Sequence, residues 1–147
     1  MYPQLIGSPF SQLDSPITLT GKVKKRLFSA GKEALPYEYS ALLAGDGSRI
    51  THLFDNPSVF REHHQFAWEG PAFLQTLRVI KEANLEWLGV VHTHPHTPPV
   101  PSPSDIAGWH YPTLSYWILS LADPNQPSLV LYQCEQGQFL ARPYTIE

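Results

Sequence analysis

The stretch that most constrains the fold of this chain is the apolar run 87–91, which leads directly into His92, Thr93 and His94. A short apolar run of this kind predicts a buried strand. Side chains alternate across a strand, so His92 and His94 project toward the same side at the strand end, where both imidazoles can reach one cation. The sequence therefore predicts a strand whose end carries half of a zinc site.

A second local pattern supplies the other half. Ser102 follows His94 by eight positions and Asp105 follows three later, with Pro103 between them. A Ser N-cap, a Pro at the first helical position and an acid at the third predict the start of a short helix with a capping box. Such a helix start would fix the direction of the Asp105 carboxylate and turn it back over the strand end. Three protein ligands would leave the fourth tetrahedral position to water, as in catalytic zinc sites.

The third feature is Glu38, at the mouth of an apolar strand that ends in a Gly-Asp-Gly turn. In that place its carboxylate lies at a strand end and outside the core. A lone glutamate of this kind is most often a solvated charge, and a lone His-x-His pair is common by chance. The specific signal is the joint order of a Glu, a His-x-His-Pro and a Ser-x-x-Asp.

This order and spacing resemble the JAMM motif of the MPN-domain (JAB1/MPN/Mov34) metalloproteases, of the compact prokaryotic type. The similarity also includes the Leu-Leu-x-Gly strand after Glu38 and the Gly-x-x-His strand that ends at His92. It is close over residues 37–105 and loose over the remainder of the chain.

The resemblance implies a role for each of these residues. His92, His94 and Asp105 would hold one Zn²⁺, which lowers the pKa of a bound water from about 15.7 toward roughly 7. Glu38 would accept the proton of that water and return it to the departing amine. Ser102 would donate a hydrogen bond to the carbonyl oxygen that becomes negative. This chemistry requires no nucleophilic side chain.

The resemblance also implies an α/β fold, the MPN (JAB1/MPN) domain, in which a mixed β-sheet is flanked by helices in a cytidine-deaminase-like architecture. We expect residues 1–147 to form a single JAB/MPN metalloprotease domain, with 1–16 as an extended N-terminal arm. Periodicity and turn residues predict helices over 18–33, 70–84 and 103–110 and strands over 38–45, 49–55, 64–68, 86–93, 114–121, 128–134 and 138–144.

Length and composition exclude several other metal hydrolases. A chain of 147 residues is too short for the barrel enzymes that also place His-x-His at a strand end. A cupin needs a glutamate soon after the second histidine, and none follows His94 until Glu135. Zinc deaminases need a Pro-Cys-x-x-Cys ligand pair, whereas Cys134 is the single cysteine of this chain.

Charge and targeting signals bear on partners and location. The formal net charge is -3, from ten basic and thirteen acidic residues, which disfavours nucleic-acid binding. The basic residues clustered at 22–26 fall on the solvated side of the first expected helix. A lone cysteine, no signal-like N-terminus and no apolar span predict a cytoplasmic protein without membrane contact.

The expected substrate follows from the resemblance alone. It would be the C-terminal tail of a ubiquitin-like or sulfur-carrier protein, cleaved at a peptide or isopeptide bond, and a homodimer is compatible with the sequence. Two other classes stay open. A non-catalytic MPN scaffold would purify without stoichiometric zinc, and a RadC-like DNA-associated protein would show salt-dependent retention on DNA.

Overall fold

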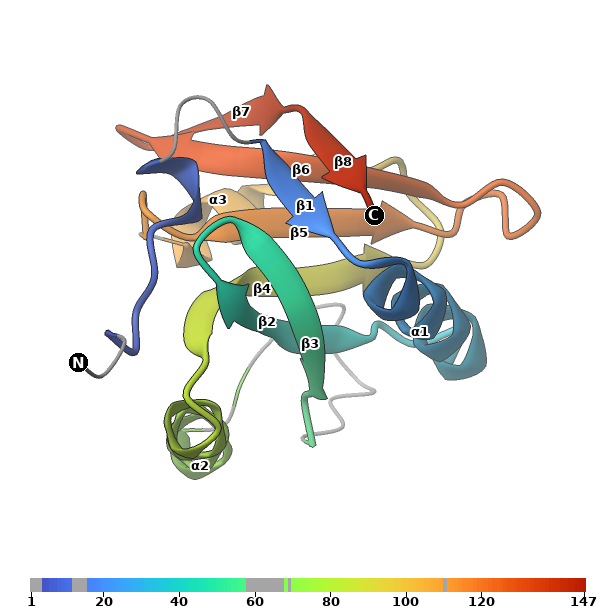
Figure 1. Ribbon diagram of the computed structural model, residues 1–147. Coiled ribbons are helices and arrows are strands. Elements are labelled where there is room, and N and C mark those ends of the chain that lie inside the picture. The colour runs from blue at the N-terminus through green and yellow to red at the C-terminus, as the bar shows by residue number, and fades with distance from the viewer. Residues whose placement is uncertain (1–3, 12–15, 58–67, 69, 110) are drawn as a thin grey trace.

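The computed structural model describes residues 4–11, 16–57, 68, 70–109 and 111–147. In this part of the chain eight strands form one sheet in the order β7-β6-β5-β4-β2-β3-β1-β8 (Figure 1). The strands are β1 (Ile17–Leu19), β2 (Ser40–Asp46), β3 (Arg49–Asp55), β4 (Glu86–His94), β5 (Ser115–Ser120), β6 (Ser128–Glu135), β7 (Gln138–Arg142) and β8 (Tyr144–Ile146). The helices are α1 (Gly21–Ala34), α2 (Gly70–Glu82) and α3 (Pro103–Gly108), and η1 (Pro9–Ser11) is a 3₁₀ turn.

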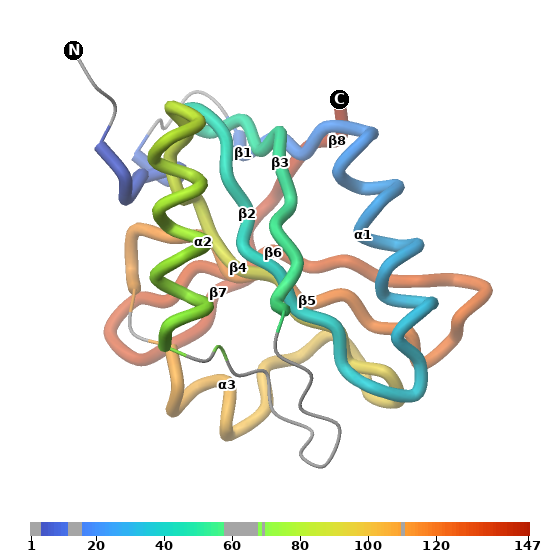
Figure 2. Tube along the Cα trace, turned by 90° about the horizontal axis from the view of Figure 1, so that it is seen from below, coloured from blue at the N-terminus to red at the C-terminus, as the bar shows by residue number. Residues whose placement is uncertain are grey.

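The sheet is mixed. β4 pairs in parallel with β5, and β1 pairs in parallel with both β3 and β8, while the other neighbours are antiparallel. Helices lie on both faces: α1 and α2 stand on opposite sides of the β2–β3–β4 region (Figure 2). The expected mixed sheet flanked by helices is therefore confirmed.

Strand β2 shows why the sequences of the central strands contain runs of consecutive apolar residues that do not alternate with polar ones. Ala41 and Leu43 belong to the core cluster on the α1 side, and Leu42 and Ala44 belong to the cluster on the α2 side. All four are buried, because both faces of the sheet are covered. Helix α2 joins the second cluster through Phe73, Leu77 and Ile80.

The prediction of a helix from residue 18 is wrong at its start. Residues Ile17–Leu19 are extended and pair with β3 and β8. The helix begins at Gly21, because the Thr20 side chain accepts a hydrogen bond from the Val23 N–H (3.3 Å) and caps it. Leu19 therefore packs into the core as part of β1 and is not part of the apolar face of α1.

The single strand predicted over 138–144 is also wrong. Pro143 has no N–H to donate and separates β7 from β8. These two strands are neighbours in sequence, yet they occupy opposite ends of the strand order. The sheet is therefore strongly curled, and β8 closes against β1 (Figure 1).

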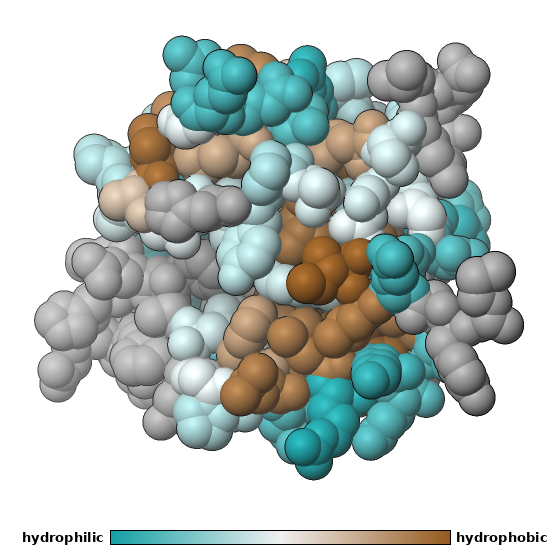
Figure 3. All heavy atoms as spheres, turned by 90° about the vertical axis from the view of Figure 1, so that its left-hand side faces the viewer, coloured by the Kyte–Doolittle hydropathy of each residue, from teal (hydrophilic) through white to brown (hydrophobic). Residues whose placement is uncertain are grey.

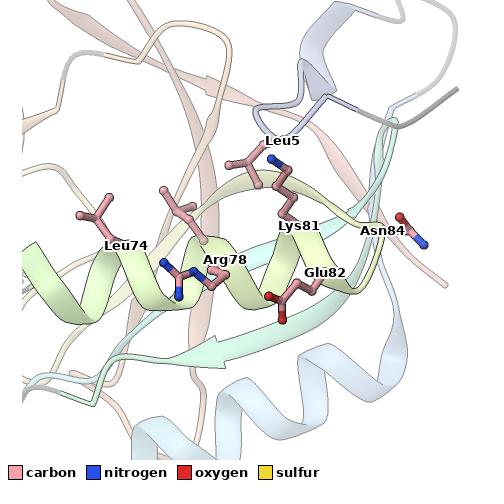
Figure 4. A pocket seen from close by; sticks show the side chains of 7 residues that line it. Leu5, Leu74, Arg78, Lys81, Glu82 and Asn84 are labelled. Carbon is pink, nitrogen blue, oxygen red and sulfur yellow. The ribbon is translucent and has the colours of Figure 1, made fainter.

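The described part of the N-terminal arm runs beside β4. Ile6 forms a parallel bridge with Trp87, and the Gly7 N–H donates to the Trp87 carbonyl at 2.9 Å. Apolar side chains are exposed on the side of the molecule that carries this arm and α2 (Figure 3). A groove there is lined by Leu5, Leu74, Leu77, Arg78, Lys81, Glu82 and Asn84 (Figure 4).

One expected element lies largely beyond the described residues. The short strand predicted over 64–68 falls outside them except for Trp68, which belongs to no strand. His63, His64 and His110 also fall outside them. Among the residues that are described, no helix has the length and apolar character needed to cross a membrane.

Candidate metal centre

The two histidines lie where strand β4 places them. His92 and His94 are buried, with 1% and 6% of their surface exposed. β4 is an interior strand, paired with β2 through His92↔Ser40 and with β5 through His94↔Ser120. The backbone of both histidines is therefore fixed by neighbouring strands.

Helix α3 brings Asp105 to the same place through the expected capping box. The Asp105 N–H donates to Ser102 Oγ (3.2 Å), and the Ser102 N–H donates to Asp105 Oδ2 (2.8 Å). Pro103 is the first helical residue. The carboxylate is turned toward β4, with Oδ1 at 3.1 Å from His92 Nε2 and Oδ2 at 3.3 Å from His94 Nε2.

The spacing of these atoms fits a small divalent ion. His92 Nε2 and His94 Nε2 are 3.1 Å apart, close to their separations from the carboxylate. Tetrahedral ligands with bonds of about 2.0–2.1 Å stand about 3.3–3.4 Å from one another. Among the residues described, these three form a group able to hold a metal ion. Their geometry and donor types suit zinc.

His94 is oriented from behind by the Pro-rich loop 95–101. Its Nδ1–H donates to the Pro98 carbonyl at 2.9 Å, so in the neutral ring the Nε2 lone pair is directed toward the metal position. The loop is fixed in turn, since Ser120 Oγ donates to the Thr97 carbonyl (2.6 Å) and Tyr132 donates to the Pro99 carbonyl (2.5 Å). Three consecutive carbonyls are thus each held by a side chain.

The charges of the group favour cation binding. Burial lowers the pKa of His92 and keeps its imidazole neutral. Burial opposes ionisation of Asp105, but hydrogen bonds from both histidines outweigh it and hold the pKa of that carboxyl below its usual range. Burial also opposes protonation of His94, yet Asp105 and the Pro98 carbonyl raise its pKa. Metal binding would therefore displace a proton from this imidazole.

Glu38 lies two residues before β2 and faces the same group. Burial raises its pKa from 4.5 to about 7, Asp105 adds to the rise, and His94 partly offsets it. Its Oε2 atom is buried and has no hydrogen-bond partner among the described residues. A carboxylate oxygen in this position can accept a hydrogen bond from a metal-bound water. A carboxylate with a pKa near 7 suits general base catalysis at neutral pH.

Ser102 is held at the site by its N-cap role. Its Oγ accepts the Asp105 N–H, so the hydroxyl proton remains available to a ligand. Its expected function as a donor to a developing oxyanion stays a prediction. His96 is exposed beyond the ligand pair, in keeping with a cleft or solvent position.

Tyr116 is a residue of the site that sequence reasoning missed. Its ring packs edge-on against His92, with centroids 5.4 Å apart, and lies tilted against Trp109, with centroids 5.2 Å apart. Burial raises the pKa of its hydroxyl, and the nearby Asp105 charge raises it further. No local pattern marks this tyrosine, because its place depends on the pairing of Val90 with Tyr116 between β4 and β5.

Glu38 is expected to titrate near neutral pH in the metal-free protein, with a carboxyl ¹³C midpoint near its pKa of about 7. Zinc should lower this midpoint, because a nearby cation favours the carboxylate. Since folding raises this pKa above 4.5, the contribution of Glu38 to stability is present below pH 4.5 and is lost as pH rises through about 7. Carbon-detected NMR measures the midpoint, and a metal-free value of 4.5 would contradict the burial of this carboxyl.

Comparison with solved structures agrees with this fold. Protein DSY2949 from Desulfitobacterium hafniense is 28% identical, covers 88% of this chain and 92% of its own, and has a TM-score of 0.76. AF2198, a JAB1/MPN domain protein from Archaeoglobus fulgidus, is 19% identical, with 90% and 98% covered and a TM-score of 0.61. A structure described as JAMM, a metalloprotease-like zinc site in the proteasome and signalosome, is 18% identical, with 90% and 100% covered and a TM-score of 0.58.

The fold and the site together define a JAB1/MPN-type domain with a complete His-His-Asp group. The family model for prokaryotic homologs of the JAB domain matches residues 21–135, and the chain belongs to this family. No curated protein matches the chain. The expectation of a compact prokaryotic JAMM/MPN protein is thus confirmed.

Proposed function

We propose that this protein is a zinc-dependent peptidase or isopeptidase that uses a metal-activated water. The observation that carries the proposal is the placement of Glu38, a half-buried glutamate whose carboxyl pKa is raised to about 7, beside three ligand atoms at tetrahedral spacing. A similar fold of 18% identity is described as a metalloprotease-like zinc site, which supports the same chemistry here.

The residues of the chain divide the reaction between them. A divalent cation in the site supplies Lewis acidity, which lowers the pKa of water from about 15.7 toward about 7. Glu38 accepts a proton from the attacking water as the new C–O bond forms, and it delivers this proton to the amine nitrogen as the C–N bond breaks. Ser102 donates a hydrogen bond to the carbonyl oxygen as negative charge builds up, a contact worth roughly 3–4 kcal/mol in other hydrolases.

We further propose that the substrate is the C-terminal tail of a ubiquitin-like or sulfur-carrier protein. Two apolar side chains next to the site support a polypeptide substrate: Val100 is 60% exposed in the Pro-rich loop, and Ile106 is 44% exposed directly after Asp105. The loop keeps its shape through its own anchors, so it offers a preformed wall. An extended tail with a Gly-Gly end would pass this wall without side-chain clashes.

A cleavage panel tests this proposal. Sulfur-carrier fusions, linear ubiquitin and branched ubiquitin are incubated with the zinc-loaded protein, and with the Glu38→Gln variant as the matched control. Cleavage after the terminal glycines by the wild type alone is the supporting result. Absence of cleavage of every substrate would count against the proposal. Absence of stoichiometric zinc would favour the scaffold class, and salt-dependent DNA retention would favour the RadC-like class.

Substitution of two isoleucines of similar exposure tests whether Ile106 contacts the substrate tail. Ile106→Glu is expected to raise the KM for the protein substrate about tenfold with a smaller change in kcat, because it places a charge where the tail would lie. Ile146→Glu is the control, since Ile146 is 41% exposed in β8 and lies outside the site. Equal KM values for the two variants would exclude Ile106 from the docking surface.

A further inference from the structure

Thr93, the residue between the two histidine ligands, faces the opposite side of the sheet. Strand alternation directs His92 and His94 toward α3 and directs Thr93 toward α1. A Cβ added to Gly31 of α1 would lie 3.1 Å from Thr93 Cγ2, so the glycine lets the helix approach this side chain closely. Thr93 is fully buried at this contact.

The hydroxyl of Thr93 is bonded to the residue that follows Glu38. The Tyr39 N–H donates to Thr93 Oγ1 at 2.8 Å, across 54 positions of sequence, and the Thr93 N–H donates to the Tyr39 carbonyl at 2.9 Å. Both backbone polar groups of Tyr39 thus bind the same threonine. The Thr93 hydroxyl thus accepts the Tyr39 N–H one residue before β2 begins to pair with β4 at Ser40↔His92.

Tyr39 is also held at its other end. Its hydroxyl donates to Asp55 Oδ1 at 2.5 Å, and Asp55 Oδ2 lies 2.6 Å from Arg26 Nη2. The ring packs against the core cluster on the α1 side. The side chain of the preceding residue, Glu38, lies within electrostatic reach of His94 and Asp105 on the ligand side.

The link to Glu38 is one peptide unit. The Tyr39 N–H and the Glu38 carbonyl belong to the same planar group, so fixing the direction of the N–H fixes the carbonyl and the adjoining Glu38 Cα. We propose that Thr93 is a positioning residue that holds Glu38 at its working distance from the His92–His94–Asp105 group. The inference rests on the proposed function of Glu38 as base. One short segment of β4 would then set the places of both the ligands and the base.

Three variants test the proposal. Thr93→Val removes the hydroxyl at nearly constant volume, Thr93→Ser keeps it, and Thr76→Val removes a hydroxyl that bonds the Ala72 carbonyl inside α2. We expect Thr93→Val to retain zinc and to lose about 10²-fold in kcat with little change in KM, as for a misplaced catalytic group. Thr93→Ser and Thr76→Val should stay within a few-fold of wild type.

Amide exchange gives a readout that does not depend on turnover. The Tyr39 amide should lose its protection in Thr93→Val and keep it in Thr93→Ser. The Glu38 carboxyl ¹³C resonance should move in the first variant only. If Thr93→Val does not fold, Thr93→Ala takes its place.

The outcomes separate the two proposals. A wild-type protein that cleaves no substrate contradicts the proposed function, and the amide and carboxyl signals then decide on positioning alone. Wild-type kcat in Thr93→Val, an equal loss in Thr93→Ser, or an unmoved Glu38 resonance in Thr93→Val would each overturn the positioning role.

Discussion

Glu38→Gln is expected to keep its zinc and to lose turnover by about 10²–10⁴-fold, the usual contribution of a general base. Glutamine matches glutamate in shape, and it cannot accept the proton of the attacking water. The three ligand side chains are untouched, so metal content should equal that of the wild type. The loss should appear in kcat and in kcat/KM alike, because the interaction is made in the transition state.

Glu38→Gln should also change how the free energy of unfolding depends on pH. The raised pKa of Glu38 means that folding favours its protonated form, and this contribution is lost as pH rises through about 7. Glutamine is neutral at every pH, so this part of the pH dependence should vanish in the metal-free variant. Glu33→Gln, an exposed change in α1, is the control and should match the wild type. Zinc loss in Glu38→Gln, or undiminished turnover, would contradict the assigned role.

Asp105→Asn should have the largest effect on the metal itself. The change removes the negative charge of the ligand set and replaces a carboxylate that contacts both imidazoles. Loss of an outer hydrogen-bond partner already costs about 10–100-fold in metal affinity, so loss of a charged ligand should cost more than about 10²-fold. Turnover should fall together with metal affinity, since the cation would no longer be bound at ordinary zinc concentrations.

Competition with a chromophoric chelator measures this affinity. The amide oxygen of asparagine can still accept the Ser102 N–H, so α3 should remain capped and the fold intact. Asp46→Asn, an exposed change at the end of β2, is the matched control. Full zinc affinity in Asp105→Asn would show that the carboxylate is not a ligand.

The site was predictable because its signals are local. The strand run before His92 and the capping signature from Ser102 to Asp105 each lie within a few residues, and both elements form as expected. Glu38 carries no such local signal, and it was placed with them through the resemblance to the JAMM motif. The structure then brings Glu38 into electrostatic contact with His94 and Asp105.

The missed features depend on pairing between distant segments. β1 and β8 have three residues each, too few for a periodic pattern, and they are stabilised by pairing with one another across most of the chain. Tyr116 reaches the site only through the register of β5 against β4. The sequence gives no sign that Thr93 has a role of its own between the two ligands. Its hydrogen-bond partner Tyr39 is 54 positions away. Such contacts form only in the assembled sheet, so no short stretch of the sequence predicts them.

Zinc K-edge X-ray absorption of the stoichiometrically loaded protein tests the central claim most directly. We expect two imidazole nitrogens and two oxygens at about 2.0–2.2 Å, one oxygen from Asp105 and one from water, with no sulfur in the coordination shell. The same measurement on Asp105→Asn should show the shell altered or the metal absent. A sulfur scatterer at about 2.3 Å, which would implicate Cys134, or a wild-type protein that binds no stoichiometric metal would contradict the account.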